Sequence, residues 1–272
     1  AEVAADLYYA DVDGDWDTET CCQPGACKPA SDAPCTLVPV PEVALGRLPV
    51  ATPAEVATYL AKLQAYETAR HTDYQDRVLF MGEWAGYGPN GADVYSSSAF
   101  ESFFARLVPS TMRLSRLYAD HWDHPGALPN TADNQRAAFA EGHALVVNFG
   151  HGNETSLCNL HGDEILTLAD TGRPFVYLTT ECHSGRFIAD VTCGGAQFVR
   201  AAGGGVAYVG NADFGVGFPS LTLFYARLFR GLFGGAAEDE VRLGPLVRAS
   251  LASYTSGAAL RVPNGGDRFT NL

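Results

Sequence analysis

Basic residues are scarce in this sequence of 272 residues, which holds 18 lysines and arginines against 31 aspartates and glutamates and has a formal net charge of −13. Such an acidic chain is repelled by nucleic acid and by anionic membranes, so we expect neither as a partner; cationic substrates are mildly favoured. No apolar run approaches the roughly 18 residues of a membrane span. Since 47% of the residues are apolar and only 18% are charged, a folded globular protein is expected rather than a disordered one.

The sequence also lacks an initiating methionine and a recognisable signal peptide, and we therefore expect it to be part of a longer precursor. The cellular compartment must therefore be inferred from the cysteines. Four of the seven lie in one Pro- and Gly-containing stretch with little apolar content, which is typical of a loop held by disulfides in an oxidising environment. The sequence thus predicts a secreted or cell-surface protein. A zinc site is the alternative, although the usual CxxC pair is missing. The four are Cys21, Cys22, Cys27 and Cys35.

Aspartates recur at every second position just before this cysteine loop, at Asp11, Asp13, Asp15 and Asp17. Their carboxylates can converge on one ion as in a calcium-binding loop, so we expect structural Ca²⁺ here. The glycine stands at the fourth place of the run rather than the sixth, which excludes an EF-hand. A solvated acidic turn is the alternative.

Strand and helix patterns alternate from residue 52 onward, which predicts an α/β fold with a mostly parallel sheet sandwiched by helices. Thr52, Pro53 and Glu55 carry the N-cap, first-turn and capping-box signals of a helix start. The apolar residues that follow at helical spacing should face a core: Val56, Tyr59, Leu60, Leu63 and Tyr66. Strands are expected at 78–81, 112–118, 144–149, 174–180 and 205–210, with a loop at 86–93. Further helices are expected at 98–107, where Ser98 and Glu101 give a capping-box signal, and at 131–141, 157–171, 195–202, 220–233 and 245–254.

Two of these strands end in reactive residues. The run 144–149 leads into His151, and the run 174–180 leads into Cys182. Both runs are continuously apolar, as in buried parallel strands, and a helix between them would make them parallel neighbours. Because sites in open α/β sheets form beyond the carboxyl ends of the strands, His151 and Cys182 are expected to share one cleft.

A cysteine and a histidine in one cleft are the two side chains that a thiol hydrolase needs. The cysteine attacks as thiolate, the histidine supplies a proton to the leaving amine, and backbone amides beside Gly152 and Gly185 can receive the oxyanion. The alternative is that His151 only ends a strand and Cys182 is a buried thiol. His183 is the rival base and Cys158 the rival nucleophile, although Cys158 is expected to be paired or structural. The other histidines are expected on the surface or in loops: His71, His121, His124, His143 and His161.

The His-Gly pair and the Cys found 31 residues later resemble the catalytic domain of the gingipain-like cysteine peptidases, which are relatives by fold of caspases and legumain. The segments DLYYAD, EVALGRLP and GGGVAYVG at residues 6–11, 42–49 and 203–210 support the resemblance, which covers nearly the whole chain. It implies a caspase-haemoglobinase-like fold. Residues 1–70 would be the end of a smaller N-terminal subdomain, and residues 71–272 the catalytic subdomain.

The resemblance also implies roles for single residues. His151 would be the general acid and base and Cys182 the nucleophile, with the N–H groups of Gly152 and Cys182 as oxyanion hole. Glu83 matches a glutamate that orients the catalytic histidine, and Asp93 an aspartate that binds the guanidinium of an arginine substrate. From the residues alone, Glu83 could also be an exposed loop charge, and Asp93 a helix cap.

Departures from the family pattern concern the substrate pocket. Either Phe214 or Phe218 substitutes for the aromatic lid of the arginine-specific members or the pocket differs from theirs, and Glu181 adds negative charge beside the thiolate. With Asp93, these are the residues expected to contact substrate. The sequence thus predicts a secreted cysteine endopeptidase that cleaves proteins or peptides after Arg or Lys. The alternatives are a catalytically silent binding or scaffold domain and a peptidase specific for Asn or Asp; oligomeric state is left open.

Overall fold

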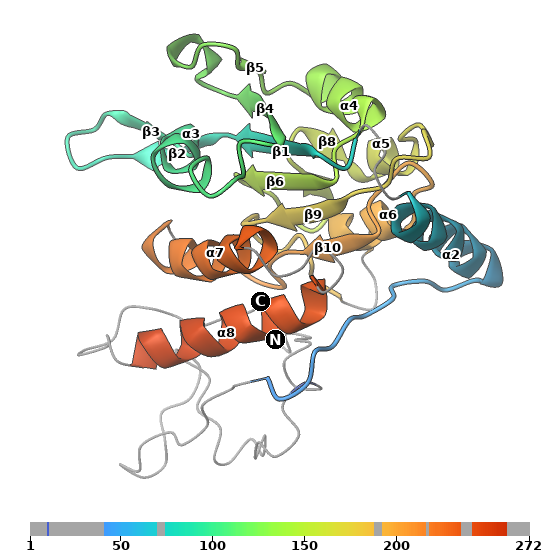
Figure 1. Ribbon diagram of the computed structural model, residues 1–272. Helices are drawn as coiled ribbons and strands as arrows, with labels where there is room; N and C mark the ends of the chain where they lie inside the picture. Colours follow the sequence, from blue (N-terminus) through green and yellow to red (C-terminus); the bar gives the residue numbers. More distant parts are fainter. Residues whose placement is uncertain are drawn as a thin grey trace. The chain divides into compact units, whose positions relative to one another are not determined.

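The computed structural model describes residues 10, 41–69, 74–187, 192–215, 218–234 and 241–259 (Figure 1). The chain forms two compact units, residues 1–3 with 48–214 and residues 4–47 with 215–272. The aspartates at 11–17 and the four cysteines at 21–35 lie outside the described residues, so the calcium site and the disulfide loop stay predictions.

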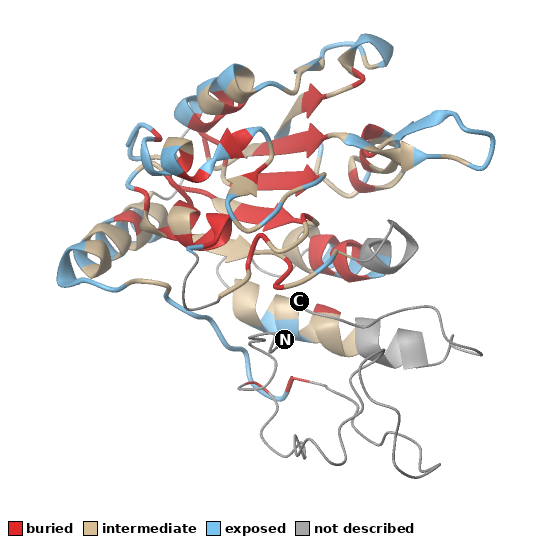
Figure 2. Ribbon diagram, turned by 180° about the vertical axis from the view of Figure 1, so that it is seen from behind, coloured by how far each residue is buried: buried red, intermediate tan, exposed pale blue. Residues whose placement is uncertain are grey.

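A six-stranded sheet in the order β10-β9-β6-β1-β4-β5 is the centre of the first unit, and all of its neighbouring strands are parallel. The predicted α/β fold with a parallel sheet is confirmed. Figure 2 shows the buried residues gathered along these strands. The strands are β1 (Arg77–Gly82), β4 (Arg113–Tyr118), β5 (Leu128–Pro129), β6 (Leu145–Phe149), β9 (Val176–Thr179) and β10 (Ala207–Val209).

Helices cover both faces of this sheet. One face carries a core formed with α4 (Ala132–Glu141), α5 (Gly162–Leu166) and α6 (Gly194–Arg200). Its members alternate along the strands, as the two-residue period of a strand requires. Buried aromatic and aliphatic side chains of the strands and helices dominate this core: Leu79, Met81, Val146, Tyr177, Phe139, Ile165 and Phe198.

The opposite face is packed by α3 (Ser97–Ala99) and the π-helical turn η1 (Phe100–Phe104). The ring of Phe100 stacks on Phe80 and on Phe149, with centroids 4.4 and 4.5 Å apart. The predicted helix at 98–107 is thus shorter and wider than expected, and its capping box does not form. Glu101 instead binds Arg116 at 2.7 Å and accepts the hydroxyl of Tyr118 at 2.7 Å.

The helix α2 (Pro53–Thr68) begins as predicted, with Thr52 and Glu55 bonded to each other's backbone amides in a capping box. Its inner face differs from the prediction, since Leu60 is 54% exposed and Lys62 is buried. The Lys62 ammonium donates to carbonyls at the end of α6 and beyond it, those of Val199, Ala201 and Gly205, at 2.6–3.1 Å. Burial lowers the pKa of Lys62 to about 8, so the charged form persists at neutral pH.

Two predicted segments fold differently. Residues 157–171 form no long helix; the antiparallel hairpin of β7 (Ser156–Leu157) and β8 (Leu160–His161) precedes the single turn of α5. Leu157 and Leu160 are both buried in the core, because the hairpin directs both side chains toward it. The predicted loop at 86–93 lies within another antiparallel hairpin, of β2 (Trp84–Tyr87) and β3 (Asp93–Tyr95).

The second unit contains α7 (Phe218–Phe233) and α8 (Leu243–Ala259), which pack on each other. A Cβ on Gly231 would stand 2.5 Å from Leu246, so this glycine permits close contact. Among the described residues, no helix is long and apolar enough to cross a membrane. The helix α2 lies in the unit of the sheet; the subdomain boundary near residue 70 stays a prediction.

Candidate active site

The register of three neighbouring strands brings the predicted catalytic residues to one edge of the sheet. Gly82 of β1 pairs with Phe149 of β6, and Asn148 of β6 pairs with Thr179 of β9. Glu83, His151 and Cys182 follow these three strand ends, and the strands are parallel. The expected adjacency of the strands that lead to His151 and Cys182 is therefore confirmed, although the connection between them differs.

The carboxyl of Glu83 holds the loop that carries His151. Its Oε2 accepts the backbone N–H of His151 at 2.9 Å. A Cβ on Gly150 would collide with the Glu83 carboxyl, so the close approach requires glycine at this position. Burial raises the pKa of Glu83, while the amide and the charge of His151 oppose that rise. Glu83 is thus no exposed loop charge; it contacts His151 through the backbone.

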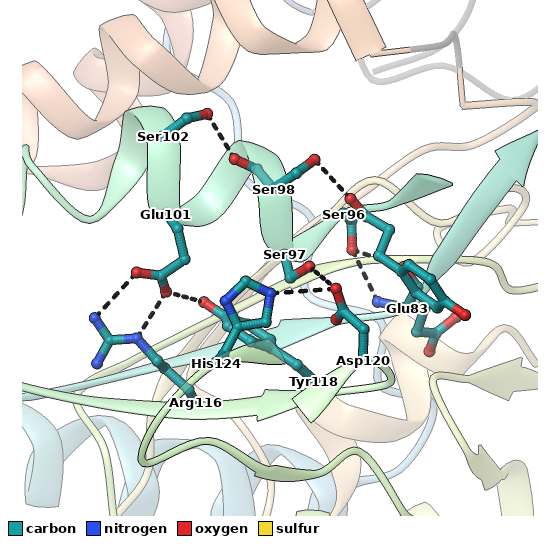
Figure 3. A network of polar contacts seen from close by, with 11 residues as sticks. Glu83, Ser96, Ser97, Ser98, Glu101, Ser102, Arg116, Tyr118, Asp120 and His124 are labelled. Atoms are coloured by element: carbon teal, nitrogen blue, oxygen red, sulfur yellow. Dashed lines mark hydrogen bonds and ion pairs between the residues drawn. The ribbon is translucent and has the colours of Figure 1, made fainter. Parts of the chain in front are cut away.

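Ser96 ties the ends of β1 and β6 together. Its hydroxyl accepts the N–H of Glu83 at 2.8 Å and donates to the carbonyl of Phe149 at 2.6 Å. Figure 3 shows this serine beside Glu83, next to a second network in which Ser97 donates to Asp120 at 2.6 Å. Sequence reasoning did not identify Ser96, because a serine before a helix usually reads as a cap.

The β2–β3 hairpin places Trp84 between Asp93 and His151. The indole N–H of Trp84 donates to Asp93 Oδ1 at 2.9 Å, and its ring centroid lies 6.0 Å from that of His151. Asp93 is exposed and belongs to a strand, not to a helix cap. Its carboxylate is therefore connected to the surroundings of His151 through one side chain.

Buried polar side chains hold the turn of Cys182. Ser184 donates to the carbonyl of Glu181 at 3.0 Å, and Asn211 donates to the carbonyls of Thr180 and Glu181 at 2.8 and 3.2 Å. The N–H of Gly185 donates to the Asn211 carbonyl at 2.8 Å. The amide of Gly185 is therefore already engaged; the assignment of Gly152 and Cys182 as oxyanion donors stays a prediction.

His183 follows Cys182 with a left-handed backbone, φ 54°. Its N–H donates to the Asp213 carbonyl at 2.8 Å, and its ring Nδ1 lies 3.4 Å from the Asp213 carboxylate. Phe214, which is 62% exposed, packs edge-on against the imidazole of His183, and the two ring centroids lie 4.4 Å apart. The rival base is thus held by Asp213 and Phe214. Phe218 begins α7, and its side chain lies outside the described residues.

Glu181 is fully buried, and its carboxyl accepts the backbone N–H of Cys158. Burial, with the nearby Glu83, raises the pKa of Glu181 well above its usual range. This shift favours the neutral form of the carboxyl and opposes the expected negative charge beside the thiolate. Gly152 packs directly on this residue, because a Cβ there would lie 2.9 Å from Glu181 Cβ.

Cys158, the rival nucleophile, is a free thiol and not a disulfide partner. Its Sγ lies 2.5 Å from the Tyr177 hydroxyl. Burial and the neighbouring carboxyls raise the pKa of the Cys158 thiol well above its usual range. A thiol that resists ionisation is a poor nucleophile, so Cys158 is a weaker candidate for the attacking role than the sequence alone left open.

Two solved protease structures have a similar fold. The structure is similar to that of the Arg-specific cysteine proteinase gingipain R, with a TM-score of 0.66 and 17% identity over 94% of this chain and 54% of that one. A complex of pro- and mature domains of RgpB from Porphyromonas gingivalis gives a TM-score of 0.61 and 18% identity over 80% of this chain and 52% of that one.

The chain thus spans about half the length of the solved structures that it matches. No curated protein sequence matches it significantly. The model of peptidase family C25 matches residues 2–270. Together with the caspase-like fold, this match shows that the chain belongs to peptidase family C25, the gingipain family.

Proposed function

We propose that this chain carries the catalytic centre of a cysteine endopeptidase, with Cys182 as nucleophile and His151 as general acid and base. The observation that carries the proposal is the common edge of β1, β6 and β9, where Glu83, His151 and Cys182 follow adjacent parallel strands. Membership of a peptidase family supports it.

The residues divide the chemistry between them. The Cys182 thiolate attacks the carbonyl carbon of the scissile bond, and the oxyanion is stabilised by the N–H groups of Gly152 and Cys182. The C–N bond breaks as His151 gives a proton to the leaving amine, which forms a thioester. His151 then takes a proton from water, and the hydroxide releases the acid and restores the thiolate.

Specificity for Arg or Lys at the cleaved position is the second part of the proposal. An Asp93 carboxylate can receive a guanidinium, and the excess of acidic over basic residues favours a cationic substrate. Asp93 is exposed and already accepts the indole N–H of Trp84, which weakens its role as the guanidinium receptor; specificity for Asn or Asp is the alternative. We propose secretion because of the cysteine-rich segment. Protein or peptide substrates are proposed because the mechanism cleaves a peptide bond.

Fluorogenic peptides ending in Arg, Lys, Asn or Asp test the proposal. We expect turnover of the Arg or Lys peptide, lost by about 10³-fold or more in Cys182→Ala and retained in the control Cys193→Ser, which removes another thiol. Asp93→Asn should abolish cleavage after Arg while Cys182 still reacts with iodoacetamide. Selective cleavage after Asn or Asp would reject the basic specificity. No turnover together with no selective labelling of Cys182 would instead indicate a silent domain.

A further inference from the structure

Three side chains suited to bind a metal ion converge next to the proposed catalytic residues. They are Glu83 after β1, Cys158 in the β7–β8 turn and Glu181 after β9, and one ligand atom from each lies within 4.8 Å of the others. They come from three separate parts of the chain, so the fold itself assembles the cluster. The mechanism uses neither the Cys158 thiol nor the Glu181 carboxyl.

The two carboxyl groups each have one oxygen that lacks a partner. Glu83 Oε2 accepts the N–H of His151 and Glu181 Oε1 accepts the N–H of Cys158. The second oxygens, Glu83 Oε1 and Glu181 Oε2, are buried and form no hydrogen bond. A buried polar atom without a partner costs roughly 1–3 kcal/mol, and a cation between these oxygens would offset that cost.

The backbone of Cys158 supports a role for its thiol. Its φ of 53° lies in the left-handed region, where glycine costs less and a side chain stores strain. The turn nevertheless presents a cysteine, whose Sγ lies within the cluster and beside the hydroxyl of Tyr177. A residue selected only for the turn would have no need of sulfur.

We propose that Glu83, Cys158 and Glu181 form a binding site for a divalent cation of the Zn²⁺ class. Zinc accepts thiolate and carboxylate ligands together, whereas Ca²⁺ and Mg²⁺ bind oxygen almost alone. Binding forms one metal–sulfur and two metal–oxygen bonds. The protons that leave the Cys158 thiol and the Glu181 carboxyl pass to solvent, and no oxidation is involved.

Occupation of this site inhibits the peptidase, a consequence that rests on the proposed function. Glu83 holds the amide of His151, and Gly152 packs on Glu181. A cation that draws the two carboxyls together displaces the loop of His151 and Gly152. It also places positive charge beside the histidine that must gain and lose a proton.

The binding test uses the Cys182→Ala protein, in which the catalytic thiol cannot ligate metal, with a phosphine as reductant. Titration with Zn²⁺ gives affinity and stoichiometry, and Co²⁺ reports thiolate ligation by its charge-transfer absorption. Adding Cys158→Ser should abolish the absorption of this site and weaken its zinc binding by about tenfold or more. The matched control Cys193→Ser, which alters another buried free thiol, should change neither.

Unchanged affinity and absorption in Cys158→Ser would overturn the site, since the bound zinc would then belong to other cysteines. Glu181→Gln is a second variant, and we expect it to fold because its amide oxygen can still accept the Cys158 N–H. It should also lose about tenfold in affinity, and unaltered binding by that folded variant would equally overturn the site. Displacement of Zn²⁺ by excess Ca²⁺ would reject the thiolate ligand.

Inhibition is measured separately on the peptidase. Zn²⁺ should inhibit wild-type turnover and inhibit Cys158→Ser about tenfold less. Zinc that binds through Cys158 without slowing turnover would overturn the inhibitory role. A protein that cleaves no peptide would reject the proposed function and the inhibition with it, while the binding test in Cys182→Ala still decides the site.

Discussion

The hydrogen bond from the His151 amide to Glu83 indicates how a substitution of Glu83 should act. Glu83→Ala removes the acceptor and frees the loop, so we expect kcat to fall by about 10²-fold. Glu83→Gln keeps an oxygen that can accept the amide and should stay within about tenfold of wild type. Measured kcat and KM for the cleaved peptide decide this.

A loss in Glu83→Gln as large as that in Glu83→Ala would contradict backbone positioning and favour a charge acting on the imidazole. Glu154→Gln is the control, because Glu154 is another carboxylate near the turn of Cys182 and binds Arg186 at 3.1 Å. It should leave kcat unchanged.

His143 is buried, although the sequence suggests a loop or surface residue. Its Nδ1–H donates to the Ala138 carbonyl at 3.0 Å, and its Nε2 lies 3.0 Å from the Ser115 hydroxyl. Burial lowers the pKa of His143 below its ordinary 6.5. As pH falls through about 6.5, the unfolded chain therefore binds a proton at this histidine and the folded chain does not. The free energy of unfolding decreases in this pH range.

His143→Asn should flatten this dependence, since an amide donates to Ala138 without titrating. Urea unfolding between pH 5 and 8 measures it, with the exposed His161→Asn as control. Equal slopes of unfolding free energy against pH in wild type and His143→Asn would disprove the assignment.

At the scale of elements, Lys62 connects α2 to the end of α6. Lys62→Met keeps the aliphatic stem but leaves several carbonyls without a donor, so the free energy of unfolding should fall by about 2–3 kcal/mol. Chemical denaturation measures the change. Gln64→Met, an exposed position of the same helix, should have almost no effect, and a similar loss in both variants would show that the carbonyl contacts are unimportant.

The sequence predicts most of the strands and the edge where Glu83, His151 and Cys182 lie, because continuous apolar runs and strand ends follow from local pattern. The hairpin of β7 and β8, the burial of Lys62 and the raised pKa of Glu181 depend on partners far along the chain. Glu181 meets Cys158, and Lys62 meets residues near 200. Such pairings follow from the assembled sheet and not from any window of sequence.

At the scale of the whole molecule, the second unit includes the stretch in which Asp11, Asp13, Asp15 and Asp17 are expected to bind Ca²⁺. A cation held by several carboxylates stabilises the folded chain by mass action, since the unfolded chain offers no assembled site. EDTA should therefore lower Tm, and Ca²⁺ should restore it. Asp13→Asn with Asp15→Asn should remove the difference between the two conditions, while Asp163→Asn, which changes an acidic residue in the first turn of α5, should keep it.

This calcium dependence is separable from the zinc site because the two sites differ in donor atoms and in position along the chain. Ca²⁺ restores Tm through oxygen ligands, so Cys158→Ser should respond to EDTA and Ca²⁺ as wild type does. A Tm that EDTA leaves unchanged in the wild type would reject calcium at the aspartates. A response that disappears in Cys158→Ser would instead show that the stabilising ion sits beside Glu83 and Glu181.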